Sequence, residues 1–430
     1  MGEGRTGPVD AVLVGAGNRG LFTYGGFARR HPERLRFRAV AEPDPARRRR
    51  FAEEHAIPPA RRHADWRALL DGPPRAEAVV VATGDTLHVE PALAALARGR
   101  HVLLEKPIAP DPADCVRVVE AAERAGRILQ IGHVLRFAAF YGEVARILAS
   151  GELGELVNLD LKEHVAHWHM AHSYVRGKFR RRALAAPILL AKACHDLDLM
   201  VWFAGRPVSR VASFGALTHF RPEAAPAGAT ARCSDGCPVQ ATCPHDAEHF
   251  YLAPDERLAT VWPWADLGPD PSREARRRAL EEGPYGRCVY RCDNDVLDHQ
   301  VVAVAFEGGP TATFTLQGLA PEERRTLRLT GTRGELRGVL HEGVLEITRP
   351  GVLGAERIQV SGSPLGHFGG DDGLVAHFVE SVASGDPARG SGRVALEGHL
   401  LGFAAEEARA TGRVVDLATY RERLGAPRPA

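Results

Sequence analysis

The sequence has neither an excess of charge nor a long apolar run. Its 55 basic and 54 acidic residues leave a formal net charge of +1, which argues against a nucleic-acid-binding protein whose affinity depends on neutralising phosphates. No apolar run approaches the roughly 18 residues of a membrane-spanning helix. Residues 1–10 also lack the basic start, apolar centre and cleavage site of a signal peptide. We therefore expect a cytoplasmic protein without nucleic-acid or membrane partners.

Lysine is scarce. Arginine supplies nearly all of the 55 basic residues, and lysine occurs only at positions 106, 162, 178 and 192. Lysine, unlike arginine, can give up its proton near neutral pH when its surroundings favour this. The two lysines that fall within motifs, Lys106 and Lys192, are therefore candidates for chemistry.

The length of 430 residues exceeds that of a typical domain, about 150 residues, and predicts two domains. In the first part of the chain, short apolar runs alternate with helical patterns of about 10 to 15 residues, which indicates parallel βαβ units. After residue 136 the strand-like runs follow one another with few helices between them. This second pattern predicts an open, mostly antiparallel sheet.

A glycine-rich turn follows the first apolar run. Gly15, Gly17 and Gly20 stand in the order that allows a tight turn, close approach of the backbone to a pyrophosphate, and close packing of the next helix. Glu42, at the end of the next strand, is the acidic partner expected for a ribose diol. A carboxylate there would repel a 2′-phosphate, so the sequence favours NAD over NADP. The arginines at 47–50 are interpreted as one solvated helix face.

These patterns set the predicted α/β architecture. Residues 1–133 form a Rossmann NAD-binding domain, and residues 134–430 form an α/β domain with an open, mostly antiparallel sheet. Residues 220–298 are rich in Pro, Gly and Cys and show little periodicity, which is unusual for a loop within a compact domain. We interpret them as an ordered insertion or lid.

Further motifs identify a family. Residues 82–88 read Ala-Thr-Gly-Asp-Thr-Leu-His, residues 105–107 place Glu-Lys-Pro at a strand end, and residues 132–137 begin Gly-His and end Arg-Phe. With the glycine turn, they resemble the Gfo/Idh/MocA (glucose-fructose oxidoreductase / inositol dehydrogenase) family over nearly the whole chain outside the insertion. The resemblance implies oxidation or reduction of a secondary hydroxyl of a sugar or cyclitol. It also implies a homodimer or homotetramer whose second-domain sheet covers the active site on one face and makes the subunit contact on the other.

Open α/β sheets bind ligands at the carboxyl ends of their strands, where the resemblance places the cofactor. The predicted cofactor-binding residues are Gly15, Gly17, Asn18, Arg19, Gly20, Glu42, Thr83, His88, Glu105 and Lys106. Lys106 is implied to lie at the nicotinamide end and to touch the substrate. There it would accept the hydroxyl proton or stabilise the developing alkoxide.

Residues 187–203 predict one long buried helix that carries His195. The resemblance implies an aspartate four residues before this histidine, but the sequence has Ala191 there, followed by Lys192. In one interpretation Lys192 replaces the missing polar group, and its charge keeps His195 neutral as a base. In the other, Lys192 forms an i,i+4 ion pair with Asp196. The candidate catalytic residues are Lys106, His195 and Lys192.

Four histidines, two aromatic residues and an arginine crowd residues 164–177. Trp168 offers an apolar face to a sugar ring, and the other side chains offer hydrogen bonds. The candidate substrate-binding residues are Arg136, His167, Trp168, His169, Tyr174, Arg176 and His299. Metal binding is the alternative for the histidines, although no carboxylate lies among them to complete a facial triad.

Five of the seven cysteines lie in the insertion, at Cys233, Cys237, Cys243, Cys288 and Cys292. Disulfides are rare in the cytosol, and clustered thiols favour a metal. Four thiolates would satisfy tetrahedral zinc, with His245 as a further candidate ligand. An iron–sulfur cluster and free thiols are the alternatives.

The leading hypothesis is an NAD-dependent dehydrogenase that moves a hydride between nicotinamide and a secondary hydroxyl of a sugar, cyclitol or sugar acid. The alternative, suggested by a branch of the resembled family, is an NAD-dependent glycosidase that oxidises a sugar carbon transiently, eliminates the aglycone and returns the hydride. A third hypothesis is a cofactor-binding protein without catalysis. Ala191 alone favours it, and the presence of Lys106 and His195 opposes it.

Overall fold

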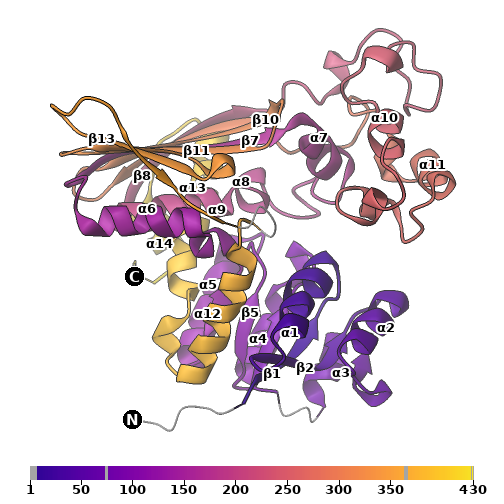
Figure 1. Ribbon diagram of the computed structural model, residues 1–430, viewed down its shortest axis with the longest axis horizontal. Helices are drawn as coiled ribbons and strands as arrows, with labels where there is room; N and C mark the ends of the chain where they lie inside the picture. Colours follow the sequence, from indigo (N-terminus) through magenta and orange to yellow (C-terminus); the bar gives the residue numbers. More distant parts are fainter. Residues whose placement is uncertain (1–6, 73–75, 363–366, 428, 430) are drawn as a thin grey trace.

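A six-stranded parallel sheet is the centre of the first half of the molecule (Figure 1). The computed structural model describes residues 7–72, 76–362, 367–427 and 429. The strand order is β3-β2-β1-β4-β5-β6. The strands are β1 (Val9–Val14), β2 (Leu35–Ala41), β3 (Arg62–His63), β4 (Ala78–Val81), β5 (His101–Leu104) and β6 (Leu129–Ile131). The connecting helices are α1 (Gly25–Arg30), α2 (Pro45–Glu54), α3 (Trp66–Asp71), α4 (Val89–Ala97) and α5 (Pro112–Ala125).

The central strands of this sheet are buried on both faces. Every residue of β4 and β5 is buried, which is why their sequences read as continuous apolar runs rather than as alternating patterns. Parallel strands all end at the same edge of the sheet. The loops after β1, β2, β4 and β5 therefore meet at one carboxyl edge.

The second half is built on a nine-stranded sheet in the order β14-β13-β12-β11-β7-β10-β9-β8-β15. Its strands are β7 (Leu156–Ala166), β8 (Val208–Ala216), β9 (His299–Phe306), β10 (Thr311–Ala320), β11 (Arg324–Gly331), β12 (Glu335–Val339), β13 (Val344–Thr348), β14 (Glu356–Gln359) and β15 (Val415–Asp416). The central β10–β7 pair is parallel, and the neighbouring pairs are antiparallel.

Helices cover one face of this second sheet. Figure 1 shows α6 (Ala139–Ser150), α9 (Cys194–Ala204) and α13 (Gly392–Thr411) between the sheet and the first half of the molecule. Along β9 exposed and buried residues alternate, as expected when only one face of a sheet is packed. The opposite face presents apolar side chains, among them Phe214, which is 73% exposed, and Val301, which is 41% exposed.

The C-terminal helices join the two halves. Leu374 and Phe378 of α12 (Gly370–Ser384) pack in the same apolar cluster as Leu13 and Val80 of the parallel sheet. Helix α13 contacts both α9 and α5, and the short α14 (Leu417–Leu424) follows β15. One helix beyond residue 134 thus completes the core of the first half.

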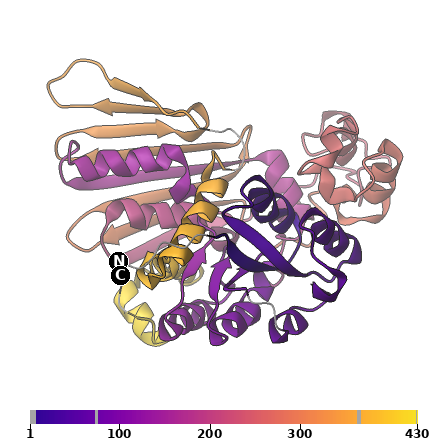
Figure 2. The ribbon, with the colours of Figure 1, turned by 60° about the horizontal axis from the view of Figure 1, so that its bottom comes forward.

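The Cys-rich insertion lies between β8 and β9 and stands out at one end of the molecule (Figures 1 and 2). It contains α10 (Ala247–Leu252), α11 (Arg273–Glu282) and several single-turn helices. Its own apolar cluster is small and consists of Ala247, Tyr251, Leu252 and Leu280.

The predicted α/β class, with a parallel sheet followed by an open, mostly antiparallel one, is confirmed. Two details differ from the prediction. Short edge strands such as β3 and β15, of two residues each, were not expected because they carry no periodic signal. The predicted helix over 187–203 is interrupted at Lys192 and Ala193, between α8 (Ile188–Ala191) and α9. No helix in the described ranges is long and apolar enough to cross a membrane.

Candidate active site

The glycine loop after β1 has the shape that its sequence predicts. Gly15 has φ +95°, and a Cβ there would lie 2.6 Å from the carbonyl oxygen of Ala82. At Gly20 a Cβ would lie 2.2 Å from the carbonyl oxygen of Gly15. Gly17, in contrast, faces open space, with the exposed Asn18 beside it. The two outer glycines are therefore required by the fold, while the middle one leaves room for a phosphate to approach the backbone.

Glu42 closes this loop from the end of β2. One carboxylate oxygen accepts a hydrogen bond from the backbone N–H of Ala16 at 2.7 Å, and the other accepts one from the N–H of Asp44 at 3.0 Å. Two carboxylate oxygens offer about four lone-pair sites, so Glu42 retains capacity for a ribose diol. The glycine loop and Glu42 together fit a dinucleotide.

Arg19 and Glu105 link the glycine loop to the end of β5. The Arg19 guanidinium pairs with Glu105 and, at 2.8 Å, with Asp371 of α12. Tyr24 donates its hydroxyl to the same Glu105 oxygen at 2.6 Å. Burial would raise the pKa of Glu105, but Arg19 and the Tyr24 hydroxyl hold it below its ordinary value. Glu105 therefore remains a carboxylate that ties two loops and α12 together.

His88 joins the loop after β4 to the loop after β5. Its Nδ1 lies 2.7 Å from the carbonyl oxygen of Pro107, and its Nε2 lies 3.3 Å from that of Thr83. The Thr83 hydroxyl in turn donates to the carbonyl of Leu87 at 3.1 Å. Thr83 and His88, both predicted cofactor residues, thus shape the edge on which Lys106 lies.

Lys106 reaches across to the second half of the molecule. Its Nζ donates a hydrogen bond to the carbonyl oxygen of Ala191 at 2.7 Å. An ammonium has three N–H donors, so this contact leaves donors for another acceptor. The position that lacks the expected aspartate therefore supplies a backbone oxygen to the same lysine.

His195 is buried one turn beyond this contact, on α9. It is 6% exposed, and its Nδ1 has no hydrogen-bond partner within the described part of the chain. Burial, and next the nearby charge of Lys106, lower its pKa well below 6.5. Burial is the larger cause, and Lys106, rather than Lys192, is the lysine whose charge adds to it. A neutral imidazole is able to accept a proton.

A buried carboxylate, Asp198, supports His195 through a second histidine. Asp198 lies 3.1 Å from Nδ1 of His133 and accepts hydrogen bonds from the Arg136 guanidinium at 2.5 and 3.0 Å. The His133 ring is 5.7 Å from that of His195 between centroids. Arg136, predicted to bind substrate, is instead committed to Asp198, and its guanidinium stacks over Trp202.

Lys192 belongs to a separate ionic cluster. Its Nζ lies 3.0 Å from Glu163 of β7, and Glu163 also pairs with Arg325 of β11. Asp196, the partner predicted from i,i+4 spacing, pairs with Arg325 at 3.0 Å. The Lys192–Asp196 prediction is wrong because the break in the helix turns Lys192 toward the sheet. Burial raises the pKa of Asp196 to about 6.

The histidine-rich segment folds into a short helical stretch after β7, formed by α7 (His167–His169) and a wide turn over Met170–Arg176. Trp168 stacks on Phe250 of the insertion at 5.6 Å between centroids. His169 lies 2.6 Å from Glu323, and burial lowers its pKa to about 4. Tyr174 is buried; burial raises its pKa well above the ordinary value, and the charges of Glu163 and Asp85 raise it further. This segment forms a wall shared by the second sheet and the insertion.

Two predicted substrate-binding residues have other roles. Arg176 is 2% exposed and donates to the carbonyl oxygens of Arg287 and His245, both at 2.7 Å. It anchors the insertion because a buried guanidinium must have its hydrogens accepted. His299 is exposed on β9 and pairs with Asp298 at 2.9 Å. The strand's alternation turns it to the uncovered sheet face, away from the helices that carry His195.

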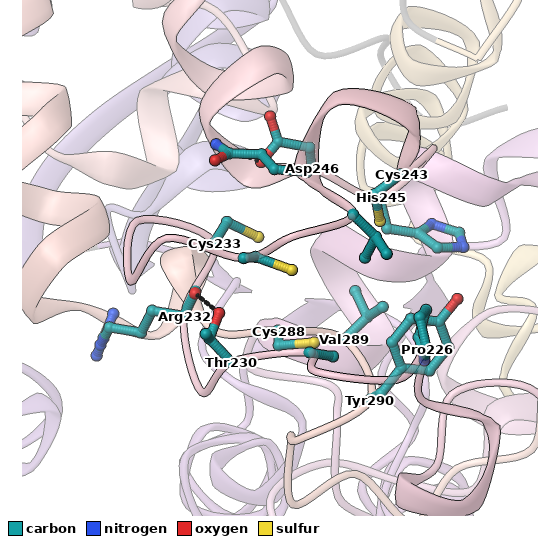
Figure 3. Close-up of a pocket in the computed structure, with 14 residues that line it drawn as sticks. Pro226, Thr230, Arg232, Cys233, Cys243, His245, Asp246, Cys288, Val289 and Tyr290 are labelled. Atoms are coloured by element: carbon teal, nitrogen blue, oxygen red, sulfur yellow. Dashed lines mark hydrogen bonds between the residues drawn. The ribbon is translucent and has the colours of Figure 1, made fainter.

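Four of the five cysteines of the insertion lie around one small cavity, shown in Figure 3. Its lining includes Cys233, Cys237, Cys243, Cys288 and His245. All five insertion cysteines are free thiols, and burial raises the pKa of Cys233 to about 11. Across the described ranges no group of three or more His, Cys, Asp or Glu side chains is arranged to hold a metal ion. The structure therefore gives no support to the zinc interpretation or to a metal at the histidines.

The sequence analysis missed the carboxylates that organise the site. These are Asp85, Glu163, Asp198, Glu323 and Asp371, which meet cations or histidines from distant parts of the chain. Asp85 belongs to the family motif at residues 82–88, which follows a predicted strand. Its position at the carboxyl edge of the sheet could have identified it as a site residue. The partners of the others depend on tertiary contacts that no local spacing reveals.

Comparison with known proteins identifies the class. The family model for the Gfo/Idh/MocA oxidoreductases with an NAD-binding Rossmann fold matches residues 9–133, and the model for their C-terminal domain matches residues 141–260. The chain belongs to this oxidoreductase family, and the resemblance inferred from its motifs is confirmed.

Individual relatives match over part or all of the fold. Inositol 2-dehydrogenase 2 of Saccharopolyspora erythraea is 36% identical over 151 residues, which are 35% of this chain and 41% of that protein. The chain thus matches less than half the length of that relative. An oxidoreductase from Agrobacterium radiobacter, solved with NAD+, L-tartaric acid and magnesium, has a TM-score of 0.67 at 19% identity and covers 96% of this chain and 99% of its own. A scyllo-inositol dehydrogenase from Lactobacillus casei has a TM-score of 0.64 at 16% identity, with coverage of 96% and 99%.

Proposed function

We propose that this protein is an NAD-dependent dehydrogenase that transfers a hydride between the nicotinamide and a secondary hydroxyl of a cyclitol, sugar or sugar acid. One observation carries the proposal. Lys106, at the carboxyl edge of a dinucleotide-binding sheet, reaches the helical segment that carries His195, and its charge adds to burial in favouring the neutral form of that histidine. When bound, NAD supplies the hydride acceptor. The protein must then handle the hydroxyl proton and the charge that develops on oxygen.

Lys106 and His195 divide these tasks. The free N–H donors of Lys106 hold the substrate oxygen and stabilise the developing alkoxide. His195 accepts the hydroxyl proton, because burial and Lys106 favour its neutral form. Asp198 and His133 hold the surroundings of His195 in place. In the reverse direction, the same groups return the proton to the alkoxide.

The substrate class is proposed from the wall opposite the cofactor edge. Trp168 supplies an apolar ring face, and His169 and Lys192 supply polar groups held by Glu323 and Glu163. Apolar faces with a few oriented polar groups suit a polyhydroxylated ring. The relative that carries the name inositol 2-dehydrogenase makes cyclitols the first compounds to test. NAD is proposed over NADP because the Glu42 carboxylate, held at the glycine loop by the Ala16 N–H, would repel a 2′-phosphate.

The test is a turnover assay with matched variants. The purified protein is incubated with NAD and a panel of cyclitols, sugars, sugar acids and aryl glycosides, while NADH absorbance and aryl release are recorded together. We expect NADH to accumulate with at least one cyclitol or sugar. Lys106→Met and His195→Asn should each lower kcat by about 100-fold or more. Lys162→Met, which removes an exposed lysine on β7, should leave it unchanged.

Two outcomes would contradict this proposal. Aryl release without net NADH would assign the protein to the redox-neutral glycosidases. Equal loss of activity in the Lys162 and Lys106 variants would mean that the assay reports general damage rather than chemistry.

We also propose that the uncovered face of the second sheet forms a homodimer or homotetramer contact. Phe214 on β8 and Val301 on β9 are direct cross-strand neighbours, and both are exposed. Large apolar side chains grouped on a sheet face are typical of a protein interface. A second copy of this chain is the proposed partner.

A further inference from the structure

Asp85 is a buried carboxylate beside the proposed catalytic lysine. It is 9% exposed and begins the single helical turn Asp85–Leu87, directly after β4. Its Oδ2 is buried and has no hydrogen-bond partner in the part of the chain that the structure describes. Leaving a buried carboxylate oxygen unpaired costs free energy. A position that keeps such a group therefore calls for a partner that arrives or moves during function.

Asp85 and Lys106 lie on neighbouring loops at the same edge of the parallel sheet. Strands β4 and β5 are parallel neighbours, with Val81 paired to Leu104, so the loops that follow them leave the same edge side by side. His88 then ties these loops together through its 2.7 Å contact with the Pro107 carbonyl. The Asp85 turn and Lys106 are thus held on adjacent, clamped loops.

The charges around Asp85 single out Lys106. Burial raises the pKa of Asp85 above 3.8, and the strongest opposing charge is Lys106, followed by His88 and Lys178. In the second half of the molecule, burial raises the pKa values of Tyr174 and Cys194, and the charge of Asp85 adds to this effect. No other cation among the described residues acts on this carboxylate more strongly than Lys106 does.

The other carboxylates near Lys106 are already engaged. Glu105 is held by Arg19 and Tyr24. Asp198 is held by Arg136 and His133. Of these three carboxylates, Asp85 is the one with a buried oxygen that lacks a partner in the described ranges, so it is available to balance the charge of Lys106.

We propose that Asp85 is a positioning residue that accepts a hydrogen bond from Lys106 Nζ in the working site and keeps this lysine charged while the substrate oxygen becomes an alkoxide. The proposal rests on the function proposed above. Bound NAD+ adds a positive charge beside Lys106 and favours loss of the lysine proton. Asp85 offsets that charge, so Lys106 remains able to stabilise the oxygen that loses its proton to His195.

The small number of lysines makes a direct test feasible. Protein labelled with 13C at the lysine ε-carbons should give four ε-methylene signals, one for each of Lys106, Lys162, Lys178 and Lys192. The Lys106 signal is assigned with Lys106→Arg, and its titration is followed in NAD-saturated protein without substrate. In the Asp85→Asn variant this signal should titrate about one pH unit lower or more.

Further variants separate positioning from structure. Asp85→Glu retains the negative charge, so its Lys106 signal should titrate at nearly the same pH as in the parent protein. Asp71→Asn, a change at an exposed aspartate, should leave the titration of Lys106 unchanged. In the turnover assay, the alkaline limb of the pH profile of kcat should move to lower pH in the Asp85→Asn variant. The affinity of this variant for NAD, measured by fluorescence, should stay within about threefold of that of the parent protein.

Each outcome is decisive. An unmoved Lys106 signal in folded Asp85→Asn overturns the proposal. A large loss of NAD affinity would make Asp85 a cofactor ligand and overturn it as well. A shifted Lys106 signal in a protein that oxidises nothing on the panel supports the Asp85–Lys106 pairing and refutes the proposed dehydrogenase instead.

Discussion

The ion pair between Asp198 and Arg136 offers the sharpest test of how the site is held. Asp198 is 1% exposed and meets both Arg136 and His133. Replacing it with Asn keeps the shape of the side chain but leaves the Arg136 guanidinium, whose side chain is only 15% exposed, without its counter-charge. Breaking a buried pair in this way typically costs about 3–5 kcal/mol. We expect Asp198→Asn to lower the free energy of unfolding by about that amount at pH 7.

The matched control is Asp372→Asn. Asp372 pairs with Arg30, and both side chains are about half exposed. Solvent-exposed pairs contribute about 0–1 kcal/mol, so the same chemical change should be nearly silent there. Urea unfolding of both variants and the parent, followed by circular dichroism, gives the comparison. Equal losses in the two variants would refute the argument that burial makes the Asp198 pair critical.

The pH dependence supplies a second check on the same variant. Burial raises the pKa of Asp198, but Arg136 and His133 more than compensate and hold it well below 3.8. A carboxylate with a depressed pKa contributes stability above its unfolded value and loses it as the pH falls. The difference between parent and Asp198→Asn should therefore be constant near neutral pH and shrink below about pH 4. A difference that instead grows in acid would show that another group dominates.

Three further predictions follow from single features of the structure. Glu42→Ala removes the carboxylate that holds the Ala16 N–H, and kcat/KM should shift at least about tenfold from NAD toward NADP; an unchanged ratio would contradict this role. Phe214→Glu should dissociate the oligomer in analytical ultracentrifugation, while Leu353→Glu, at another exposed apolar side chain, should not. Cys233, with a pKa of about 11 against an ordinary 9.0, should be alkylated about 100-fold more slowly than a free thiol at pH 8; alkylation that starts only after a chelator is added would restore the zinc interpretation.

The cofactor half of the site was predictable because its chemistry is local. Gly15 and Gly20 are fixed by backbone contacts within one βαβ unit, and Glu42 ends the strand next to β1. Lys106 follows a strand whose carboxyl edge is set by the same topology. In each case a few consecutive residues determine both the conformation and the direction of the functional group.

The substrate half was predicted less well because its side chains pair across long sequence separations. Spacing on an ideal helix placed Lys192 beside Asp196, but the helix break directs it to Glu163 on another element. Arg176 was a candidate substrate-binding residue, and its buried side chain instead anchors the insertion. A charged side chain takes the nearest buried counter-charge or carbonyl, and only packing decides which one that is.

The sequence by itself determined the α/β class, the family and the dinucleotide edge, since glycine geometry and strand periodicity depend on neighbouring residues alone. The tertiary structure decided which carboxylate meets which cation, which face of the second sheet stays uncovered, and that four of the insertion cysteines line one cavity. Those outcomes depend on how separate elements pack, because a buried charge or thiol acquires its environment only when distant segments close around it.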